Sequence, residues 1–327
     1  MDHSKKISLH IPGGDTGLQP ILYNYQENFP FFILHKLRWF LNGNISFFLP
    51  ILNFLGLKFT IVNRLGAPGD TLITANVIKC LKKQFPRLRI NCITPYKELL
   101  DFDPNINSIN QQETFFSADS SYIDLARSKV KDVNVVEYIL TNLGGKDFEY
   151  KGQYIISARE TEWAKKKLLA INTQKPILAI CTRSKESVKN WPKGNWIKLI
   201  EKIKAKFYII QLGDSAEPYY DNVNRFAGYL SMRESASILS LSDFFIGPDS
   251  LLMHLANALS IPSTIIFGGS RPVNALGYSQ NKNLSTSPAC GPCWIHDEER
   301  TCPYNIQCMD EISVDAVIQT IEPRTKF

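Results

Sequence analysis

Three segments of the sequence place charged side chains at points where a predicted strand passes into a predicted helix. The first is Gly-Ala-Pro-Gly-Asp at 66–70, in which two glycines let the backbone approach a ligand closely and Asp70 stands where the helix begins. A carboxylate there can accept a proton from a substrate hydroxyl, but Asp is also a common helix cap. The turn lacks the three spaced glycines of a dinucleotide-binding loop, which disfavours a nicotinamide or flavin enzyme.

The second segment follows a predicted strand at 177–182. Thr182 ends this strand, and the following loop carries several cations, including Lys189, into a Trp-Pro pair. Hydroxyl and ammonium groups at the carboxyl end of a strand suit a bound phosphate. A solvated basic loop is the alternative interpretation.

The third segment, Gly-Pro-Asp-Ser-Leu-Leu-Met-His at 247–254, again leads from a strand into a helix. The first backbone N–H groups of a helix have no partner within it, so those of residues 250–252 are predicted to point toward a ligand. Asp249 and His254 flank this turn. A helix cap and a structural histidine are the alternatives for these two side chains.

A fourth candidate is a cluster of cysteines near the C-terminal end of the sequence. The chain has seven cysteines, and four of them are Cys290, Cys293, Cys302 and Cys308. A Cys-x2-Cys pair followed by two further cysteines can supply four thiolates to one tetrahedral ion, and a reducing compartment disfavours disulfides. We expect a structural zinc or iron ion here, with free or partly oxidised thiols as the alternative.

The composition limits the classes of function. With 327 residues, 44% hydrophobic and 21% charged, the chain is predicted to be a soluble globular protein of two domains. Its net charge of +6 is spread along the sequence, which disfavours a nucleic-acid partner and is compatible with an anionic small molecule or membrane surface. No secretory signal is recognisable, so a cytoplasmic location is expected.

The apolar stretch at 29–57 needs separate consideration. Charged residues, an Asn-Gly-Asn turn and Pro50 interrupt it before it reaches the length that spans a bilayer. Two interpretations remain, a buried N-terminal helical extension and an amphipathic segment lying on a membrane surface.

Two series of alternating strands and helices must position these candidates. One covers 58–143 and the other 176–267, and the second includes a helix predicted to start near Glu217. Strand–helix–strand units imply parallel sheets, so the fold class is α/β with two Rossmann-like lobes. A ligand is then expected in a central cleft that faces the carboxyl ends of both sheets.

Taken together, the segments around Asp70, Lys189 and Asp249 resemble the heptosyltransferase family, glycosyltransferase family nine, over about residues 57–322. The resemblance implies a GT-B fold with three parts. These are an N-terminal extension at 1–56, a short acceptor lobe at 57–158, and a donor-binding lobe at 159–327 that carries the four-cysteine segment 290–308. One departure is Leu251, where the family usually has Gly.

The resemblance also implies an activity, that of an inverting glycosyltransferase that transfers a sugar, heptose from ADP-heptose, to a lipopolysaccharide, glycan or protein acceptor. Asp70 would be the catalytic base, and no catalytic metal is expected. The donor-binding positions would be Gly69, Thr182, Lys189, Asp249, Ser250, Leu251, Leu252 and His254.

The expected partners are a nucleotide-diphosphate sugar and a glycan, lipid-linked or protein acceptor. The expected location is the cytoplasm, at the inner face of the membrane if the protein makes peripheral contact with it. A catalytically silent nucleotide-sugar-binding homologue and a metal-dependent interaction module are the alternatives.

Overall fold

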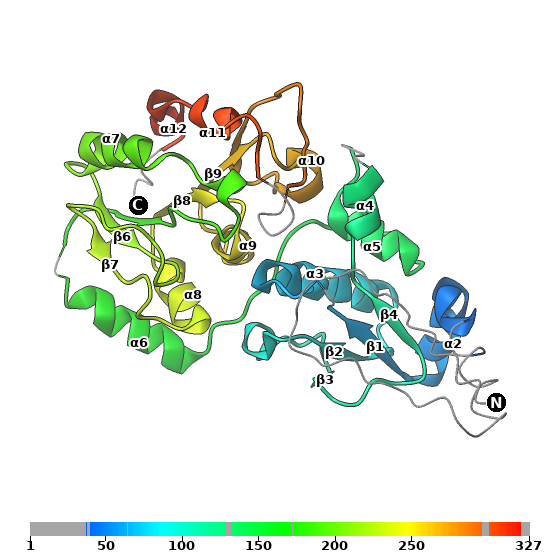
Figure 1. Cartoon of the computed structure of the whole chain (residues 1–327). Helices are drawn as coiled ribbons and strands as arrows, with labels where there is room; N and C mark the ends of the chain where they lie inside the picture. The colour runs from blue at the N-terminus through cyan, green and yellow to red at the C-terminus, as the bar shows by residue number, and fades with distance from the viewer. Residues whose placement is uncertain are drawn as a thin grey trace, which may run out of the picture.

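Runs of β-branched and aromatic residues form two parallel sheets, one in each lobe of the molecule (Figure 1). The computed structural model describes residues 37, 40–63, 65–128, 132–171, 173–295 and 301–321. Within them the strand order is β3-β2-β1-β4 in the N-terminal lobe and β10-β9-β8-β5-β6-β7 in the C-terminal lobe. The strands are β1 (Lys58–Val62), β2 (Arg89–Ile93), β3 (Ser108–Ile109), β4 (Ser117–Asp119), β5 (Ile177–Ile180), β6 (Tyr208–Gln211), β7 (Asn224–Arg225), β8 (Phe244–Pro248), β9 (Ser263–Gly268) and β10 (Lys282–Ser285).

Each sheet has one point at which the strand order reverses. In the N-terminal lobe β4 returns to pair with β1, and in the C-terminal lobe β8 returns to pair with β5. The loops that leave the carboxyl ends of two such strands diverge to opposite faces of the sheet, which opens a crevice where ligands of parallel α/β folds bind. The two reversal points therefore predict where the site of each lobe lies.

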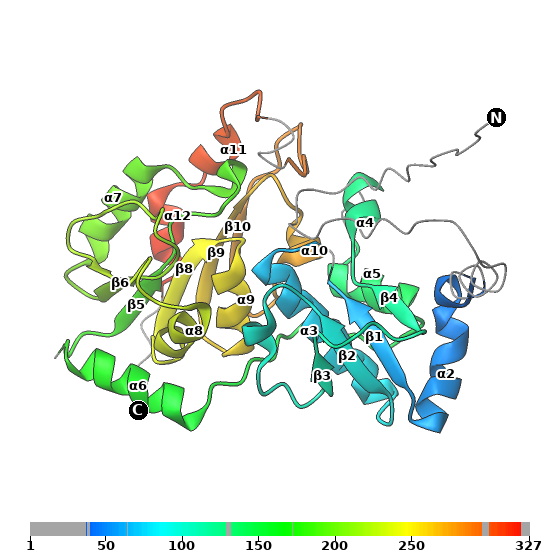
Figure 2. The same cartoon turned by 60° about the horizontal axis from the view of Figure 1, so that its bottom comes forward.

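The helices cover both faces of the C-terminal sheet and join the two lobes. Figure 2 shows α3 of the N-terminal lobe lying beside α9 of the C-terminal lobe, and the two helices are in contact. The helices are α2 (Ile45–Leu55), α3 (Pro68–Gln84), α4 (Ile123–Ser128), α5 (Val135–Asn142), α6 (Ala158–Leu169), α7 (Lys193–Ile203), α8 (Met232–Ser240), α9 (Leu251–Ala258), α10 (Val273–Leu276), α11 (Gln307–Asp310) and α12 (Val314–Gln319), with short 3-10 turns η1 (Lys97–Leu100) and η2 (Ser187–Lys189).

Alternation along the central strands divides the core of the C-terminal lobe between two faces. Ala179 and Phe245 belong to a cluster that continues into the N-terminal lobe, whereas Leu178, Ile180 and Phe244 pack on the opposite face with α7. Strands that are buried on both faces are expected in a parallel sheet covered by helices. The continuous inner cluster holds the two lobes together through α3 and α9.

The predicted α/β fold with two Rossmann-like lobes is confirmed, but the helix expected near Glu217 is wrong. Residues 212–223 form turns and irregular backbone there. Pro218 cannot donate a backbone hydrogen bond, and the Glu217 side chain accepts bonds from the end of β5, so the segment is held against the sheet and does not coil.

Most of the extension predicted at 1–56 lies outside the described residues. Its last part forms α2, whose Ile45, Leu49 and Leu52 are buried against the N-terminal lobe. Gly56 ends this helix in the left-handed conformation, with φ 63°, and the chain then enters β1. In the part of the chain that the structure describes, no helix has the length and apolar character needed to cross a membrane.

Candidate functional site

A buried hydrogen-bond network fixes the loop that carries Asp70. This loop leaves the carboxyl end of β1, and Gly66 allows its turn with φ 72°. Beneath it the Asn63 side chain donates to the Thr71 hydroxyl at 2.9 Å, and Thr71 contacts the Thr94 hydroxyl at 2.8 Å. The first turn of α3 is therefore tied to the ends of β1 and β2, which sets the position of Asp70.

Asp70 is partly buried and has two hydrogen-bond donors. The Tyr122 hydroxyl donates to its Oδ1 at 2.8 Å, and the backbone N–H of Ala67 donates to the same carboxylate. Burial raises the pKa of Asp70 from 3.8 to about 6. The hydrogen bonds and Lys189 oppose this rise, and the negative charge of Asp249 adds to it. A carboxyl group with a pKa near neutrality suits the role of general base.

Tyr122 reaches Asp70 from the segment that follows β4, the strand that pairs with β1 at the reversal point. Ser120, directly after β4, shares a 2.8 Å hydrogen bond with the Thr74 hydroxyl, and Thr74 donates to the backbone carbonyl of Asp70 at 2.8 Å. Burial and the neighbouring carboxylate raise the pKa of Tyr122 well above its ordinary value. Tyr122 therefore stays protonated and acts as a hydrogen-bond donor.

On the opposite lobe, Lys189 and Asp249 form a nearly buried ion pair. The Lys189 Nζ lies 3.0 Å from Asp249 Oδ2 and 3.1 Å from Glu186 Oε2, and Glu186 also pairs with Arg271 Nη2 at 2.9 Å. Asp249 is 4% exposed. Because Lys189 follows β5 and Asp249 follows β8, the pair lies at the reversal point of the larger sheet.

The predicted positions Ser250, Leu251 and Leu252 begin α9. Ser250 is the residue that precedes its first turn, and its side chain makes no capping bond. The first N–H groups of the helix therefore receive no capping bond from this side chain, and they give this end a partial positive charge. Leu251 has a helical backbone, which leucine adopts without strain. Its N–H group therefore has the same position that the N–H of the expected Gly would have.

His254 and Gly69 make the direct contact between the two half-sites. A Cβ on Gly69 would lie 3.0 Å from His254 Cδ2 and 3.2 Å from Nε2, so a larger residue there would have to displace the His254 ring by a few tenths of an ångström. The His254 Nδ1 contacts the Tyr278 hydroxyl at 2.8 Å, and the Tyr278 ring stacks on Tyr150 at 4.1 Å. Burial lowers the pKa of His254 to about 4, so its ring is neutral at pH 7.

Thr182 contacts a buried carboxylate and not the Lys189–Asp249 pair. Its hydroxyl donates to Glu217 Oε2 at 2.6 Å, and the backbone N–H groups of Thr182 and Arg183 both donate to Glu217 at 3.0 Å. Burial raises the pKa of Glu217, and these donors oppose that rise. Glu217 thus determines the path of the loop after β5.

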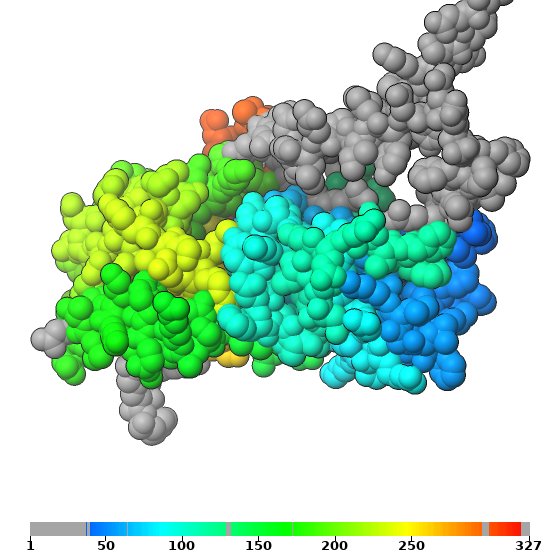
Figure 3. Space-filling view, turned by 90° about the horizontal axis from the view of Figure 1, so that it is seen from below, coloured from blue at the N-terminus to red at the C-terminus, as the bar shows by residue number. Residues whose placement is uncertain are grey.

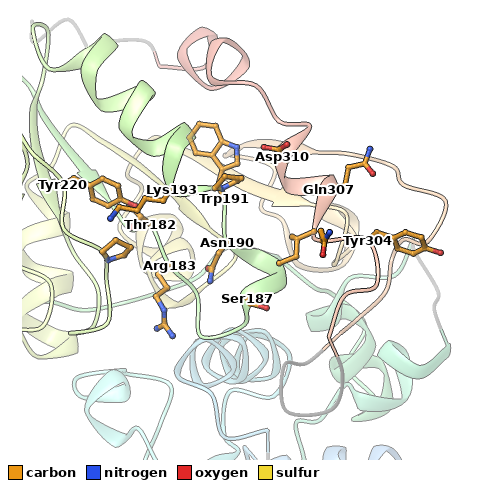
Figure 4. Close-up of a pocket in the computed structure, with 14 residues that line it drawn as sticks. Thr182, Arg183, Ser187, Asn190, Trp191, Lys193, Tyr220, Tyr304, Gln307 and Asp310 are labelled. Carbon is orange, nitrogen blue, oxygen red and sulfur yellow. The ribbon is translucent and has the colours of Figure 1, made fainter.

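The loop after β5 also forms one wall of a cavity of about 700 Å³ (Figure 4). Trp191, Lys193 and Tyr220 lie on one side of it, and Tyr304 and Gln307 lie on the other. The Lys193 Nζ lies 5.9 Å from the centre of the Tyr220 ring. A cavity of this size that combines aromatic rings with cations has the volume and chemistry to hold a nucleotide.

The four cysteines of the segment 290–308 come near one another around Cys308. Burial raises the pKa of the Cys308 thiol, negative charge on the other three cysteines would raise it further, and the Gly269 N–H donates to its sulfur. Among the described residues, which omit 296–300 of this segment, no three Cys, His, Asp or Glu side chains lie close enough together to hold a metal ion. The metal site stays a prediction.

The structure thus brings five of the predicted site residues to one place: Gly69, Asp70, Lys189, Asp249 and His254. Sequence reasoning missed four others that contact them or shape the adjoining loop: Tyr122, Glu186, Glu217 and Arg271. Glu186 stands three residues before Lys189, and a helical turn there would have indicated their pairing. Tyr122, Glu217 and Arg271 are far from their partners in sequence, and no local pattern signals them.

Comparison with known proteins gives a consistent result. Residues 135–304, a little over half of the chain, match the model of glycosyltransferase family 9 (heptosyltransferase). The chain is 28% identical over 127 residues to lipopolysaccharide heptosyltransferase 1 of Pseudomonas aeruginosa, and this match covers 36% of the chain but only 34% of that protein.

Two solved structures share the fold over most of the chain. The family 9 glycosyltransferase of Veillonella parvula aligns with a TM-score of 0.62 and 13% identity, over 80% of this chain and 96% of that one. The iron-containing dodecameric glycosyltransferase TibC of enterotoxigenic E. coli aligns with a TM-score of 0.65 and 19% identity, over 80% of this chain and 74% of that one.

Proposed function

The chain belongs to glycosyltransferase family 9, the heptosyltransferases, and on that premise we propose that it is an inverting enzyme that transfers heptose from ADP-heptose to a hydroxyl of its acceptor. The observation that carries the proposal is the meeting of two half-sites. The Asp70 carboxylate of one lobe faces the Lys189–Asp249 ion pair of the other, close enough for both charged groups to affect its pKa.

Asp70 acts as the general base in this scheme. It accepts the proton of the acceptor hydroxyl while the hydroxyl oxygen bonds to the anomeric carbon and the bond to the diphosphate breaks. Tyr122 holds one oxygen of the carboxylate in place. A single displacement with one basic carboxylate inverts the configuration at the anomeric carbon, because the acceptor attacks from the face opposite the leaving group.

The C-terminal lobe stabilises the charge that develops on the leaving diphosphate. Lys189 and Arg271 supply full positive charges, and the first N–H groups of α9 supply hydrogen bonds and a partial positive charge. Glu186 and Asp249 hold the two cations in position. Protein charges thus take the role that a divalent ion would otherwise have.

The nucleotide of the donor occupies the cavity beside Trp191 and Tyr220. The cavity lies at the carboxyl ends of the strands, next to the segment that carries Lys189. A diphosphate bound there can extend from the cavity toward Asp70. The relative TibC has been crystallised with ADP-D-β-D-heptose, which supports the choice of this donor. The Glu217-bound loop would form the floor under the nucleotide.

The proposed acceptor is a lipopolysaccharide, another glycan or a protein. The chain matches only about a third of the length of the Pseudomonas aeruginosa protein, which is named for its lipopolysaccharide acceptor. The reaction would take place in the cytoplasm, at the inner face of the membrane when the acceptor is lipid-linked.

The four cysteines would hold a structural zinc or iron ion. An all-thiolate donor set suits either metal, and the Gly269 N–H that donates to the Cys308 sulfur is the kind of contact that stabilises a metal-bound thiolate. No catalytic step passes through this ion. Metal analysis of the purified protein and of a Cys290→Ser/Cys293→Ser variant tests the assignment, and a metal-free wild-type protein would overturn it.

Donor binding and turnover together test the proposed function. In a thermal-shift screen of nucleotide sugars, ADP-heptose should raise the unfolding temperature most, because a ligand that binds the folded state stabilises it. Asp70→Ala should keep this shift and lose transfer. A preference for UDP or GDP sugars would overturn the donor, and donor binding without transfer to any acceptor would favour a catalytically silent homologue.

A further inference from the structure

The outer face of α2 exposes large apolar side chains that no part of the proposed function uses. Phe47 is 73% exposed, Phe54 is 71% exposed, and Ile51 and Leu55 are also exposed. Figure 3 shows the helix, in deep blue, at the edge of the N-terminal lobe that is farthest from the C-terminal lobe. We call these four side chains, with Phe40 and Leu57 at either end, the α2 face.

The α2 face is one continuous stripe. At about 100° per residue, positions 47, 51, 54 and 55 fall on one side of the helix, and the buried positions 45, 49 and 52 fall on the other. The buried side fixes the helix to the protein, and Phe48 packs on Phe116 at 6.1 Å between ring centres. The exposed side is therefore a rigid, preformed apolar surface, and large patches of this kind on soluble proteins mark interaction sites.

The C-terminal end of the α2 face is flanked by positive charge. The sequence contains no Asp or Glu between Glu27 and Asp70. Two exposed cations stand at the C-terminal end of α2, because the Arg87 N–H donates to the Asn53 side chain at 2.9 Å and the Arg89 N–H donates to the Leu57 carbonyl at 3.1 Å. Within the described residues, no carboxylate lies at ion-pair distance from either arginine.

We propose that the α2 face binds the surface of a bilayer that contains anionic phospholipids. Aromatic and aliphatic side chains would enter the boundary between headgroups and acyl chains, and Arg87 and Arg89 would contact the anionic headgroups. The helix of 11 residues lies on the bilayer and does not cross it.

This inference goes beyond the proposed function and stands or fails separately from it. It concerns equilibrium binding to lipid, which can be measured without donor or acceptor. Should the proposed activity also hold, a bilayer-bound α2 would place the lobe that carries Asp70 next to a lipid-linked acceptor.

Cosedimentation with sucrose-loaded vesicles tests the proposal on the full chain. We expect binding to vesicles of phosphatidylcholine mixed with about one-third phosphatidylglycerol, and much weaker binding to pure phosphatidylcholine, because each cation near an anionic surface adds to the binding free energy. Phe47→Ser/Phe54→Ser should weaken binding at least about tenfold through lost apolar burial. Arg87→Gln/Arg89→Gln should weaken it about fivefold or more, and should lower its dependence on salt.

The matched control removes equally exposed apolar side chains from the other lobe. Leu169 is 75% exposed and Tyr229 is 73% exposed, and Leu169→Ser/Tyr229→Ser should bind vesicles like the wild type. Unfolding temperatures equal to that of the wild type confirm that each variant is folded.

Three results would overturn the proposal. One is equal binding of the wild type and the Phe47→Ser/Phe54→Ser variant to anionic vesicles. Another is no binding of the wild type to anionic vesicles at low salt. The third is a dimer in solution that the Phe47→Ser/Phe54→Ser variant converts to a monomer, which would assign the α2 face to a second copy of the chain.

Discussion

Asp70 and Asp249 occupy equivalent places in the two lobes, and their surroundings differ. Each follows a strand at the reversal point of its sheet and stands at the start of a helix that faces the other lobe. Asp70 has a tyrosine and a backbone N–H as its donors, and its pKa is raised to about 6. Asp249 is almost fully buried and pairs with Lys189 at 3.0 Å.

The difference shows how one supersecondary unit yields two roles. Asp249 lies in direct contact with the Lys189 ammonium, so its role is to anchor Lys189. A carboxylate without a direct cationic partner, in a partly buried place, has a raised pKa, so it is charged at neutral pH yet basic enough to accept a proton from a substrate. The N-terminal lobe thus supplies the base, and the C-terminal lobe supplies the positive charge.

The largest expected effect comes from removing the base. Asp70→Asn preserves the size of the side chain and keeps one oxygen that can accept from Tyr122, but it cannot accept the acceptor's proton, so the turnover rate should fall by about 10³-fold. The dissociation constant of ADP should change little. Asp124→Asn, at an 82% exposed side chain in the neighbouring α4, is the control and should keep full turnover. Turnover within tenfold of the wild type in Asp70→Asn would assign the base elsewhere.

The next largest effect comes from removing Lys189, the cation that pairs with Asp249 in the C-terminal lobe. Lys189→Met should lower turnover by about 10²-fold, because the leaving diphosphate loses a positive charge. It should also lower the unfolding temperature, because Asp249 stays buried without its partner. Lys185→Met, at an exposed lysine of the same loop, should change neither quantity. If the two variants behave alike, Lys189 does not act on the donor.

A smaller effect is expected from the hydrogen bond that distinguishes Asp70 from Asp249. Tyr122→Phe removes a donor that stabilises the charged carboxylate, so the pKa of Asp70 should rise further. Activity should then fall several-fold near pH 6.5 and stay nearly unchanged at pH 8.5. An equal loss at both pH values would indicate that Tyr122 positions the backbone and does not tune the base.

The smallest effect is one on stability. The pKa of Asp70 is raised in the fold, so its contribution to stability is fully present below pH 3.8 and is lost as the pH rises through about 6. Asp70→Asn should therefore raise the free energy of unfolding by about 1 kcal/mol at pH 7.5, after allowance for solvent screening, and by less at pH 5. Urea denaturation at the two pH values measures this. A destabilised variant at pH 7.5 would contradict the raised pKa.

The positions of Asp70, Lys189 and Asp249 were predictable from the sequence because each follows a hydrophobic strand directly. In a parallel sheet the carboxyl ends of strands lie at one edge, so local patterns suffice to place such residues together. The alternation of strands and helices likewise gave the two lobes.

The remainder of the site depends on contacts between residues that are distant in sequence. Tyr122 reaches Asp70 across 52 positions, and Glu217 reaches Thr182 across 35. The alternating series of strands and helices predicted a helix near Glu217, but the buried hydrogen bonds of Glu217 to the loop after β5 determine the observed path. Of the two interpretations of the apolar stretch before β1, burial is confirmed for one side of α2, and the membrane-surface interpretation stays a prediction for its exposed side.

The pH dependence of kcat/KM tests the contrast between the two carboxylates most directly. Among the described residues that meet at the site, Asp70 has a pKa near 6, and His254 has a pKa of about 4. The wild-type enzyme should therefore lose activity as a single proton binds near pH 6, with a plateau above pH 7. A profile that stays flat down to pH 5 would show that Asp70 is not the base.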